Sequence, residues 1–431
     1  MNVELMSKNI ARREFLRRLT ASGAALAVPS FIPIAAWGQG NRPSPSNRIT
    51  IGAIGIGGMG RIDLENFLQQ PDVQVVAVCD VKDGNLRRAV ELVNGRYNNQ
   101  DCAASRDWRE LMARADLDAI YCATPDHWHA LISIAAARCG KDIYCQKPLS
   151  VTIAEGRAIA DAVKRSGIVY QSGTQRRSQA SYRFCVETAR AGRLGKLLYV
   201  ENRMGDSPGS ASPEITAPPR DIDYAMWLGP APEEPYCDLR VTGAFRHISD
   251  YAGGSMTDMG AHYNDITQML RPSHLDAPVS FQVKKARFHE RGIFDTAWGY
   301  EVVATYEDGL EIRMVEGPKG MRWVGTEGWI DHTDLGEVTA QPVSILEEKK
   351  INIPPGMVAP HHRNWLDCVK TRGRPVADAE VAHRSTTLSH AANLAMRLGR
   401  DLRWDRHTER FVNDEAANHM IARTMRAPWT L

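Results

Sequence analysis

Arg48–Gly60 reads RITIGAIGIGGMG. The first half is an apolar run, which is typical of a strand buried on both faces. The second half, from Gly55 to Gly60, has the spacing G-x-G-x-x-G. Glycines so spaced let the backbone turn tightly, approach a pyrophosphate and pack the next helix against the strand. Residues 61–70 look helical, so free N–H groups and the helix dipole would point at the phosphates.

An acidic residue follows the next predicted strand. Residues 73–79 are apolar, and Asp80 comes twenty residues after Gly60, where a carboxylate can bind the ribose hydroxyls. Together these features predict a dinucleotide-binding Rossmann domain; the alternative is a Rossmann-like domain that binds no cofactor. Asp80 favours NAD, since a carboxylate would repel a 2′-phosphate. Nearby basic residues keep NADP open, namely Lys82, Arg87 and Arg88.

Composition narrows the function classes. The 431 residues suffice for two domains, and Lys plus Arg (53) nearly balance Asp plus Glu (51). No polybasic run indicates a nucleic-acid partner. No apolar run beyond the N-terminal region is long enough to predict a membrane span. None of the eight cysteines forms a C-x-x-C pair, and we expect free thiols.

The N-terminal region has the architecture of an export signal. Arg12 and Arg13 precede Phe15-Leu16 and an apolar, alanine-rich stretch. This pattern resembles a twin-arginine (Tat) signal, with Ala11 and Arg17 departing from the usual residues. We therefore expect a signal peptide over 1–38, a linker over 39–47, the Tat machinery as a partner and a periplasmic or otherwise exported product. The alternative is an uncleaved amphipathic anchor helix.

Two loops after predicted strands carry candidate site residues. The strand over 117–123 leads into Thr124-Pro125-Asp126-His127-Trp128-His129, and the strand over 141–145 leads into Gln146-Lys147-Pro148. Ligands bind outside the carboxyl ends of such strands, so both loops should face the cofactor. A histidine here could also be only a cap or a core hydrogen-bond partner.

These motifs resemble the glucose–fructose oxidoreductase / inositol dehydrogenase / MocA (Gfo/Idh/MocA) family. The resemblance rests on the glycine turn, residues 123–129, Lys147-Pro148, residues 227–232, residues 250–265 and the C-terminal residues. It implies an α/β protein with an N-terminal Rossmann domain and a C-terminal α/β domain with a large open, mostly antiparallel sheet. It also implies NAD or NADP chemistry on sugars or other polyols. One departure is Gln146, where the family commonly has Glu; a carboxylate beside Lys147 is thereby lost.

The second domain contains an acid–histidine pattern. A helix starting near Gly254 would put Asp258, His262 and Asp265 on one face, at i, i+4 and i+7. An acid one turn before a histidine can orient the imidazole for general-base work. The pair could equally be a surface pair or half of a metal site, although no further ligands are apparent and we expect no metal. By resemblance, the catalytic set is Lys147, Asp258 and His262.

The remaining site residues are predicted from their places in the chain. Cofactor contacts are expected from Gly55, Gly57, Gly58, Met59, Gly60, Asp80, Thr124, Pro125, His127 and Lys147. Substrate contacts are expected from Arg176, Arg246, His247, Tyr251 and Asp265. We place the Rossmann domain at 48–172, a substrate and oligomerisation domain at 173–400, and a tail at 401–431 that packs back on the Rossmann domain. We expect a dimer or tetramer.

The expected activity is an exported NAD(P)-dependent oxidoreductase with a tightly held nicotinamide. Hydride would pass between a sugar or polyol carbon and the cofactor, His262 would take the hydroxyl proton, and Lys147 would stabilise the oxygen or share the base role. Outside the cytoplasm little free NAD is expected, so a redox-neutral glycosidase, lyase or epimerase is the alternative. A non-catalytic, cofactor-bound sugar-binding protein is the third hypothesis.

Overall fold

The computed structural model describes residues 43–273, 275–346 and 359–431. The chain divides into two compact units, Met1–Asn47 and Arg48–Leu431. Of the first unit, the described part contains the short 3-10 helix η2 (Pro45–Asn47). The predicted signal peptide lies outside the described residues, as do residues 39–42 of the predicted linker. The second unit contains two sheets and the helices that cover them.

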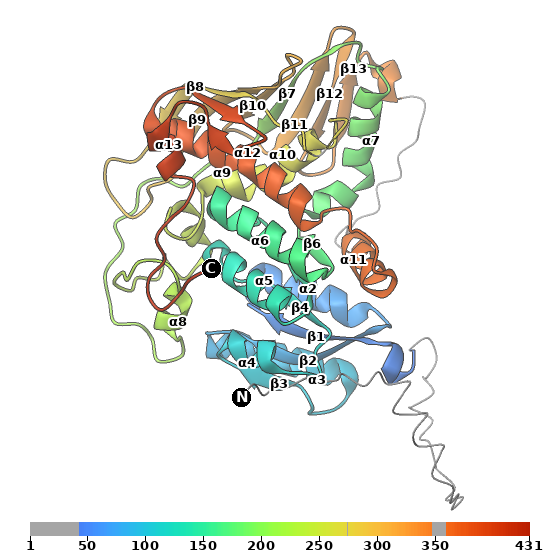
Figure 1. Ribbon diagram of the computed structural model, residues 1–431, viewed down its shortest axis with the longest axis vertical. Coiled ribbons are helices and arrows are strands. Elements are labelled where there is room, and N and C mark those ends of the chain that lie inside the picture. Colours follow the sequence, from blue (N-terminus) through green and yellow to red (C-terminus); the bar gives the residue numbers. More distant parts are fainter. Residues whose placement is uncertain (1–42, 274, 347–358) are drawn as a thin grey trace, which may run out of the picture. The chain divides into compact units, whose positions relative to one another are not determined.

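The N-terminal sheet is a six-stranded parallel sheet with the order β3-β2-β1-β4-β5-β6 (Figure 1). This order follows from βαβ crossovers that wind outward in both directions from β1. The strands are β1 (Ile49–Ile54), β2 (Val73–Cys79), β3 (Ala103–Ser105), β4 (Ala119–Cys122), β5 (Asp142–Cys145) and β6 (Tyr170–Ser172). The sequence therefore predicted the Rossmann-type sheet correctly.

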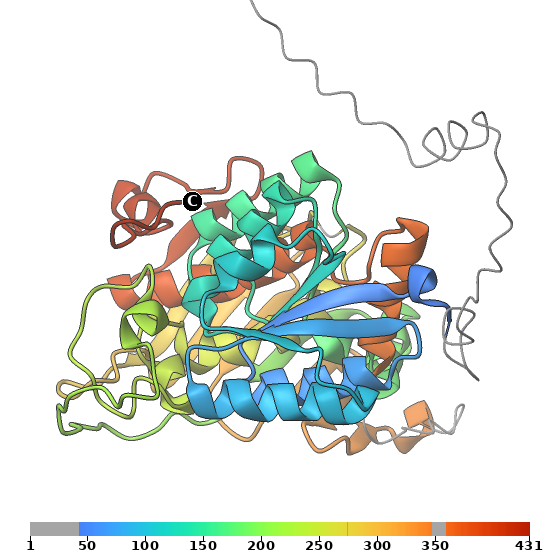
Figure 2. The same cartoon turned by 90° about the horizontal axis from the view of Figure 1, so that it is seen from below.

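Helices cover both faces of this sheet (Figure 2). One apolar cluster joins the sheet to α2 (Gly58–Gln69), α3 (Asp83–Tyr97) and α11 (Ala359–Thr371). The other joins it to α4 (Trp108–Ala113), α5 (His129–Arg138) and α6 (Ile153–Ser166). Strand β1 supplies Ile51 and Ala53 to the first cluster and Ile54 to the second, as its apolar run predicts.

The C-terminal sheet has nine strands in the order β13-β12-β11-β7-β10-β9-β8-β14-β15. Strands β7 and β10 run parallel and the other pairs are antiparallel, so the predicted mostly antiparallel sheet is confirmed. The strands are β7 (Leu197–Arg203), β8 (Ser280–Arg287), β9 (Gly299–Thr305), β10 (Glu311–Val315), β11 (Gly320–Gly325), β12 (Gly328–Thr333), β13 (Val338–Gln341), β14 (Leu402–Asp405) and β15 (Arg410–Phe411).

Helices on one face of the nine-stranded sheet enclose the largest apolar cluster, and one of them, α12, also packs against α6 (Figure 1). They are α7 (Ala180–Arg190), α9 (Gly254–Asp258), α10 (Gly260–Gln268) and α12 (Ala379–Leu398). The remaining helices are α8 (Tyr224–Leu228), α13 (Glu415–His419), η3 (Asp126–Trp128), η4 (Gln175–Ser178), η5 (Gly243–His247) and η6 (Val343–Leu346). Among the described residues, none of these helices combines the length and apolar character that a membrane crossing needs.

Two features differ from the sequence-based expectation. The helix expected from Gly254 onward is broken at Met259 into α9 and α10. The tail does not leave the second domain at once, because β14 pairs with β8 in the nine-stranded sheet. The residues after α13 then run along α6, where the N–H of Ala154 donates to the carbonyl of Ile421 at 2.9 Å.

Candidate active site

The glycine turn is built for close approach of backbone and ligand. Gly55 has a φ of +81°, and a Cβ on Gly60 would lie 2.0 Å from the carbonyl oxygen of Gly55, so neither position accepts a side chain. A Cβ on Gly57 or Gly58 would instead meet no protein atom within 4 Å. These two glycines face an open cradle at the start of α2, which fits a pyrophosphate at a helix N-terminus.

This cradle opens into a pocket of about 480 Å³. Eight of the ten predicted cofactor contacts line it: Gly55, Gly57, Gly58, Met59, Gly60, Asp80, Thr124 and Pro125. The two predicted contacts that do not line it are His127 and Lys147. The other side of the pocket contains Lys82, Asn85, Arg106, Trp108, Trp128, Met226, Trp227, Val241, Thr242, Gly243, Phe245 and Arg246. The sequence had indicated only Lys82, Trp128 and Arg246 among them, the last as a substrate contact.

Asp80 holds the glycine turn in place. Its carboxylate accepts the backbone N–H of Ile56 at 2.7 Å and of Lys82 at 2.8 Å, and the side-chain amide of Asn85 at 3.2 Å. Burial raises the pKa of Asp80. The acid therefore stands at the predicted ribose position, while Arg106 supplies a cation to the same wall of the pocket.

Residues 221–246, here called the strap, form the outer wall of the pocket. The strap is fixed to the corner after β2 by an isolated antiparallel bridge between Lys82 and Ile222. The N–H of Asp83 donates to the carbonyl of Asp221, and the N–H of Asp223 donates to that of Val81, both at 2.9 Å. The second domain thus completes a pocket that the Rossmann domain begins.

The C-terminal residues fasten the strap from outside. Arg426 donates from its backbone N–H to Pro230 O at 2.9 Å, and from its guanidinium to Gly229 O and Ala225 O, both at 3.0 Å. The Trp429 ring packs edge-on against Trp128, with centroids 4.8 Å apart. A neighbouring tail residue, Arg423, donates to Glu155 Oε1 and to the carbonyls of Asp250 and His127.

The predicted catalytic lysine and aspartate meet at the border between the two domains. Lys147 Nζ lies 2.5 Å from Asp258 Oδ1 and 3.1 Å from the Asp258 carbonyl oxygen. Arg246 Nε donates to the same carboxylate oxygen at 3.1 Å. Burial opposes the charge on Asp258, but Lys147 and Arg246 outweigh it and hold the pKa of this carboxyl far below its usual range. Asp258 is therefore an anion shared by two cations.

His262 comes close to this group without bonding to Asp258. Its ring is buried and its Nδ1 has no hydrogen-bond partner among the described residues. Burial, reinforced by Arg176 and Lys147, lowers the pKa of His262 well below its usual value, so the imidazole is neutral. The expectation that Asp258 orients His262 is wrong, because the break at Met259 leaves Asp258 turned toward Lys147 and Arg246.

Two of the five predicted substrate residues lie deep in the protein. Asp265 is 1% exposed and its carboxylate is saturated by Arg177, at 2.7 and 2.8 Å, and by Ser385. Tyr251 is fully buried, and its hydroxyl accepts from Arg240. Asp265 was predicted from its helical face and Tyr251 from its position in a motif. Neither kind of pattern reveals which partners saturate a polar group. The structure gives both residues a structural role.

The other predicted substrate residues are only partly buried. Arg176 pairs with Asp334 and stacks over the ring of Tyr263, Arg246 connects the pocket wall to Asp258, and His247 packs its ring edge-on against Phe294. Burial lowers the pKa of His247.

His127, predicted as a cofactor contact, is instead a core residue. Its Nε2 lies 2.9 Å from the carbonyl of Trp227, and burial lowers the pKa of His127 to about 3. It thus ties η3 to the strap.

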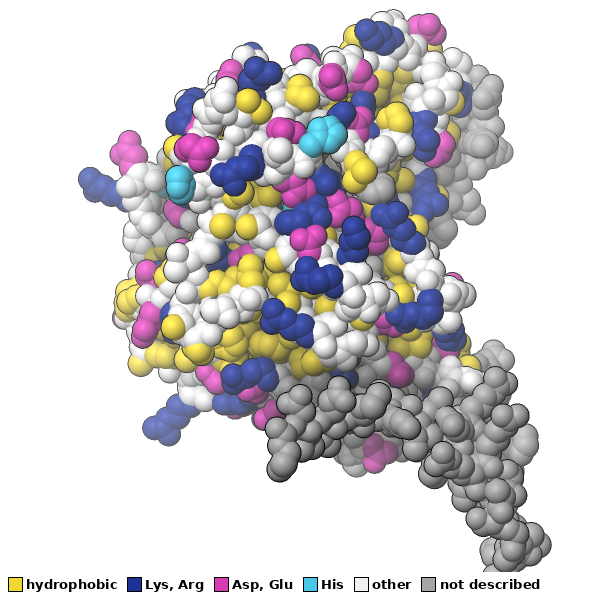
Figure 3. Space-filling view, in the orientation of Figure 1, with side chains coloured by type: hydrophobic (Ala, Val, Ile, Leu, Met, Phe, Trp, Pro, Cys, Tyr) yellow, Lys and Arg dark blue, Asp and Glu magenta, His cyan; other side chains and the backbone are white. Residues whose placement is uncertain are grey.

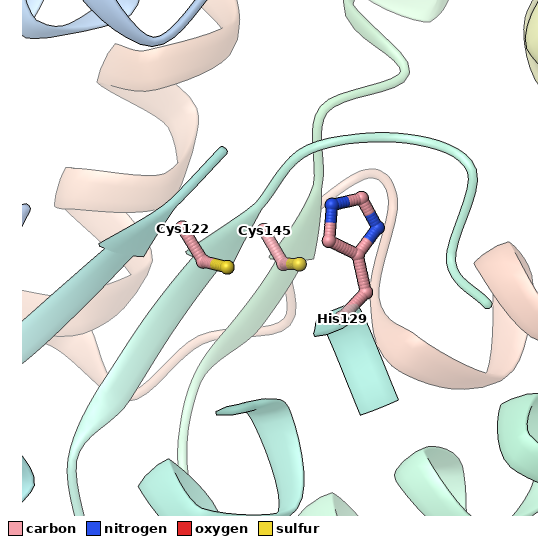
Figure 4. A group of neighbouring side chains, drawn as sticks. All are labelled: Cys122, His129 and Cys145. Atoms are coloured by element: carbon pink, nitrogen blue, oxygen red, sulfur yellow. The ribbon is translucent and has the colours of Figure 1, made fainter. Parts of the chain in front are cut away.

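One group of potential metal ligands occurs among the described residues. Cys122 and Cys145 lie opposite each other on β4 and β5, with the ring of His129 beside them (Figure 4). The ligand atoms all lie within 4.8 Å of one another. Both ring nitrogens of His129 are already engaged, however, with Pro148 O at 2.7 Å and Thr124 O at 3.0 Å. The imidazole therefore serves to hold two loops together.

Comparisons with known families agree with this architecture. The oxidoreductase family model for the NAD-binding Rossmann fold matches residues 49–174, and the model for the family's C-terminal alpha/beta domain matches residues 208–431.

Among related proteins, a glycosyl hydrolase family 109 protein of Saccharopolyspora erythraea is 29% identical over 177 residues, which are 38% of this chain and 39% of the relative. A myo-inositol 2-dehydrogenase of Thermotoga maritima is 28% identical over 146 residues, which are 34% of this chain and 42% of the relative. The chain thus spans about two fifths of the length of these relatives.

Solved structures show the same fold over most of the chain. The aldose-aldose oxidoreductase from Caulobacter crescentus, complexed with glycerol, has a TM-score of 0.64 at 19% identity, covering 83% of this chain and 99% of that one. The WlbA dehydrogenase from Bordetella pertussis, in complex with NADH and UDP-GlcNAcA, has a TM-score of 0.62 at 15% identity, with the same coverage. At these identities the likeness concerns the fold alone.

Proposed function

Because the chain belongs to the Gfo/Idh/MocA oxidoreductase family and has an NAD-binding Rossmann domain, we propose that it transfers hydride between a sugar or polyol carbon and a tightly held nicotinamide. One observation carries this proposal. Arg246 lines the nucleotide pocket and also contacts Asp258, which in turn holds Lys147. The acid–base residues therefore lie at the edge of the pocket, where a carbinol beside a nicotinamide would be.

The nicotinamide, when bound, supplies the two-electron chemistry. The chain's own residues handle the proton and the charge on oxygen. Lys147 Nζ, held in place by its contact with Asp258 Oδ1, donates a hydrogen bond to the reacting oxygen and stabilises negative charge there. His262, kept neutral by burial, can take the hydroxyl proton on a ring nitrogen. Arg246 and Arg176 offer further donors to hydroxyl groups.

The proposed substrate class rests on the family and on relatives, such as the myo-inositol 2-dehydrogenase, whose names refer to polyols or sugars. The surface carries positive and negative charges side by side, which supports a small neutral substrate over a large charged partner. Lys and Arg side chains lie among Asp and Glu across the face in Figure 3, and the formal net charge is +2.

We further propose that NAD is a resident group that the protein keeps through each cycle. Residues of the strap line the pocket, and Arg426 of the C-terminal residues holds the strap, which would slow the release of a bound nucleotide. Export through a twin-arginine signal, proposed from Arg12 and Arg13, would demand this, since the pathway carries folded proteins and free NAD is scarce outside the cytoplasm.

A redox-neutral reaction is the second candidate. It is favoured by the relatives named glycosyl hydrolase family 109 proteins, and it agrees with the proposed resident cofactor, because such a cofactor has to be reset within the cycle. Transient oxidation of a sugar acidifies the neighbouring C–H and can assist elimination of a glycosidic substituent or epimerisation.

One experiment separates these functions. Protein purified without added nucleotide is denatured and the released nucleotide is identified by chromatography and mass spectrometry; native protein is then incubated with a panel of sugars, polyols and aryl glycosides. Net NADH formation supports the dehydrogenase, and product without net NADH supports the redox-neutral enzyme. Ligand binding without any product would support a sugar-binding protein, and an empty site that binds NAD loosely would contradict the resident cofactor.

A further inference from the structure

A buried polar network lies directly beneath the catalytic lysine loop. Asp63, on α2, is fully buried, and its Oδ2 accepts from the Tyr121 hydroxyl at 3.0 Å and from the Gln146 side-chain amide at 2.5 Å. Its Oδ1 lies 3.2 Å from Nε2 of His362, which is also fully buried. Gln146 is the residue before Lys147, so the network connects α2 to the end of β5.

The network contains one carboxylate, and this carboxylate lies at position 63 and not at position 146. A buried acid at 63 and an amide at 146 make a donor–acceptor pair, whereas two acids facing each other in a dry site would repel or require a shared proton. Burial and the Asp63 carboxylate both raise the pKa of Tyr121 well above its usual value, so this phenol keeps its proton and donates. The carboxylate missing at position 146 is therefore present one helix away, at Asp63.

The side-chain amide of Gln146 is closely packed against its neighbours. A Cβ on Gly173 would lie 2.7 Å from Gln146 Cδ, which shows how closely the backbone after β6 covers the amide. With its Nε2 bound to Asp63, the amide presents Oε1 to the backbone N–H of Lys147 at 3.3 Å. The orientation of one amide thus depends on Asp63 and decides whether the Lys147 N–H has an acceptor.

We propose that Asp63 is a positioning residue for Lys147, acting through the Gln146 amide. This inference rests on the proposed catalytic role of Lys147. Helix α2 starts at Gly58 in the nucleotide cradle, so Asp63 fixes the lysine loop to the element that would hold the pyrophosphate. No bond is made or broken at Asp63 itself; it sets the direction of the amide, and the amide holds the backbone of Lys147.

The test is a cycle of three variants. In Asp63→Asn the negative charge that attracts the Gln146 NH₂ is lost, and the new NH₂ at position 63 competes for the Gln146 oxygen, which weakens the hold of this amide on the Lys147 N–H. In the double variant Asp63→Asn/Gln146→Glu, the carboxylate at position 146 accepts from both the amide introduced at position 63 and the Lys147 N–H. The donor–acceptor pair between the two positions is thereby restored, with the negative charge at position 146 in place of position 63. In Gln146→Glu alone two carboxylates meet, and we expect the Tm to fall by about 10 °C.

Two readouts report on Lys147 and not on overall stability. The first needs no sugar: the rate of acetylation of Lys147 by acetic anhydride at pH 8, measured by peptide mass spectrometry relative to exposed Lys164 of the same molecule. The second is kcat and KM on whichever sugar the panel identifies. We expect Asp63→Asn to change the Lys147 acetylation ratio at least fivefold and to lower kcat at least tenfold with KM within a factor of about three, and the double variant to return both toward wild type.

The outcomes separate this inference from the proposed function. Wild-type acetylation in Asp63→Asn, or a double variant no better than the worse single variant, would overturn the positioning role even in an active enzyme. If wild-type protein turns over no sugar, the proposed function fails, while the acetylation ratios still decide whether Asp63 positions Lys147.

Discussion

Lys147 and Asp258 are 111 residues apart in the sequence, yet Nζ of the lysine lies 2.5 Å from Oδ1 of the aspartate. The lysine follows a strand of the Rossmann sheet, and the aspartate ends a helix of the second domain. We expect Lys147→Ala to lower turnover by a factor of about 10² to 10⁴, the range of a lost acid–base or charge-stabilising group. Bound NAD should be unchanged, because Lys147 does not line the nucleotide pocket.

The measurement is product formation on the active member of the sugar panel, with NAD content determined on the same preparation. Lys164→Ala, at an exposed position on α6, is the matched control and should behave as wild type. Turnover of Lys147→Ala within a factor of about two of wild type would exclude the proposed role.

Glycines of the cradle should respond to alanine in opposite ways. In Gly57→Ala the new methyl group meets no protein atom and φ is −75°, so the fold should be intact while the cradle is filled. We expect NAD affinity to fall at least tenfold, about 1.4 kcal/mol, with the Tm of the nucleotide-free protein within about 2 °C of wild type. In Gly60→Ala the methyl group would collide with Gly55 O, and the Tm itself should fall.

Calorimetric titration with NAD and thermal unfolding of nucleotide-free protein measure the two effects. A Gly57→Ala protein with wild-type affinity would show that the pyrophosphate does not use this cradle.

Arg426 should govern how long the nucleotide stays bound. Arg426→Ala removes two side-chain hydrogen bonds to carbonyls of the strap, and bonds from a charged donor contribute about 1.5–3 kcal/mol each. We expect NAD dissociation to accelerate roughly 10- to 100-fold, measured by exchange of bound NAD for an isotopically labelled form. Arg400→Ala, which removes an exposed ion pair with Asp414, is the control. Equal exchange rates in both variants would mean that the strap opens without involving the tail.

Asp126 gives a prediction with a pH signature. It is 4% exposed, its Oδ2 has no hydrogen-bond partner among the described residues, and burial raises its pKa to about 7 against the opposing effect of Arg246. A folded-state pKa above the unfolded value means that this group's contribution to stability is fully present below about pH 4 and is lost as the pH rises through 7. Asp126→Asn, which cannot ionise, should therefore be more stable than wild type at pH 8, by about 2–4 kcal/mol.

Urea unfolding of wild type and Asp126→Asn at pH 8 and near pH 4 tests this. The gain should shrink to below about 1 kcal/mol at the lower pH. Asp101→Asn, at an exposed position, should show no such dependence. A gain that is the same at both pH values would show that folding does not raise the pKa of Asp126.

The sequence predicted the features that follow from residue patterns within a single strand or turn. The glycine spacing of Arg48–Gly60 and the acid at Asp80 both lie in local patterns, and the structure has them. It could not predict which polar groups are already saturated. Asp265 looked like a site residue because it shares a helical face with His262, and only Arg177, 88 residues away, explains its burial.

The rest of the site depends on contacts between residues that are far apart in the sequence. The role of the strap as a wall of the pocket was not predicted, since nothing local shows that Ile222 bridges to Lys82. Arg106 lines the pocket without belonging to any motif, and the motif over residues 227–232 did not reveal that Trp227 lines it. The partner of Gln146 was equally hidden, because Asp63 is an ordinary acid in a helical pattern until the two elements are packed.

Contacts of Arg423, Arg426 and Trp429 place residues that are synthesised late against His127, Gly229 and Trp128, beside a pocket whose glycine turn is synthesised far earlier. A ribosome-bound chain that has folded only its first sheet presents an open cradle, from which a nucleotide can come and go. Enclosure begins when these late residues emerge and dock. The order of synthesis therefore sets the order of assembly: the nucleotide enters early, and residues 423–429 close the pocket over it late in folding.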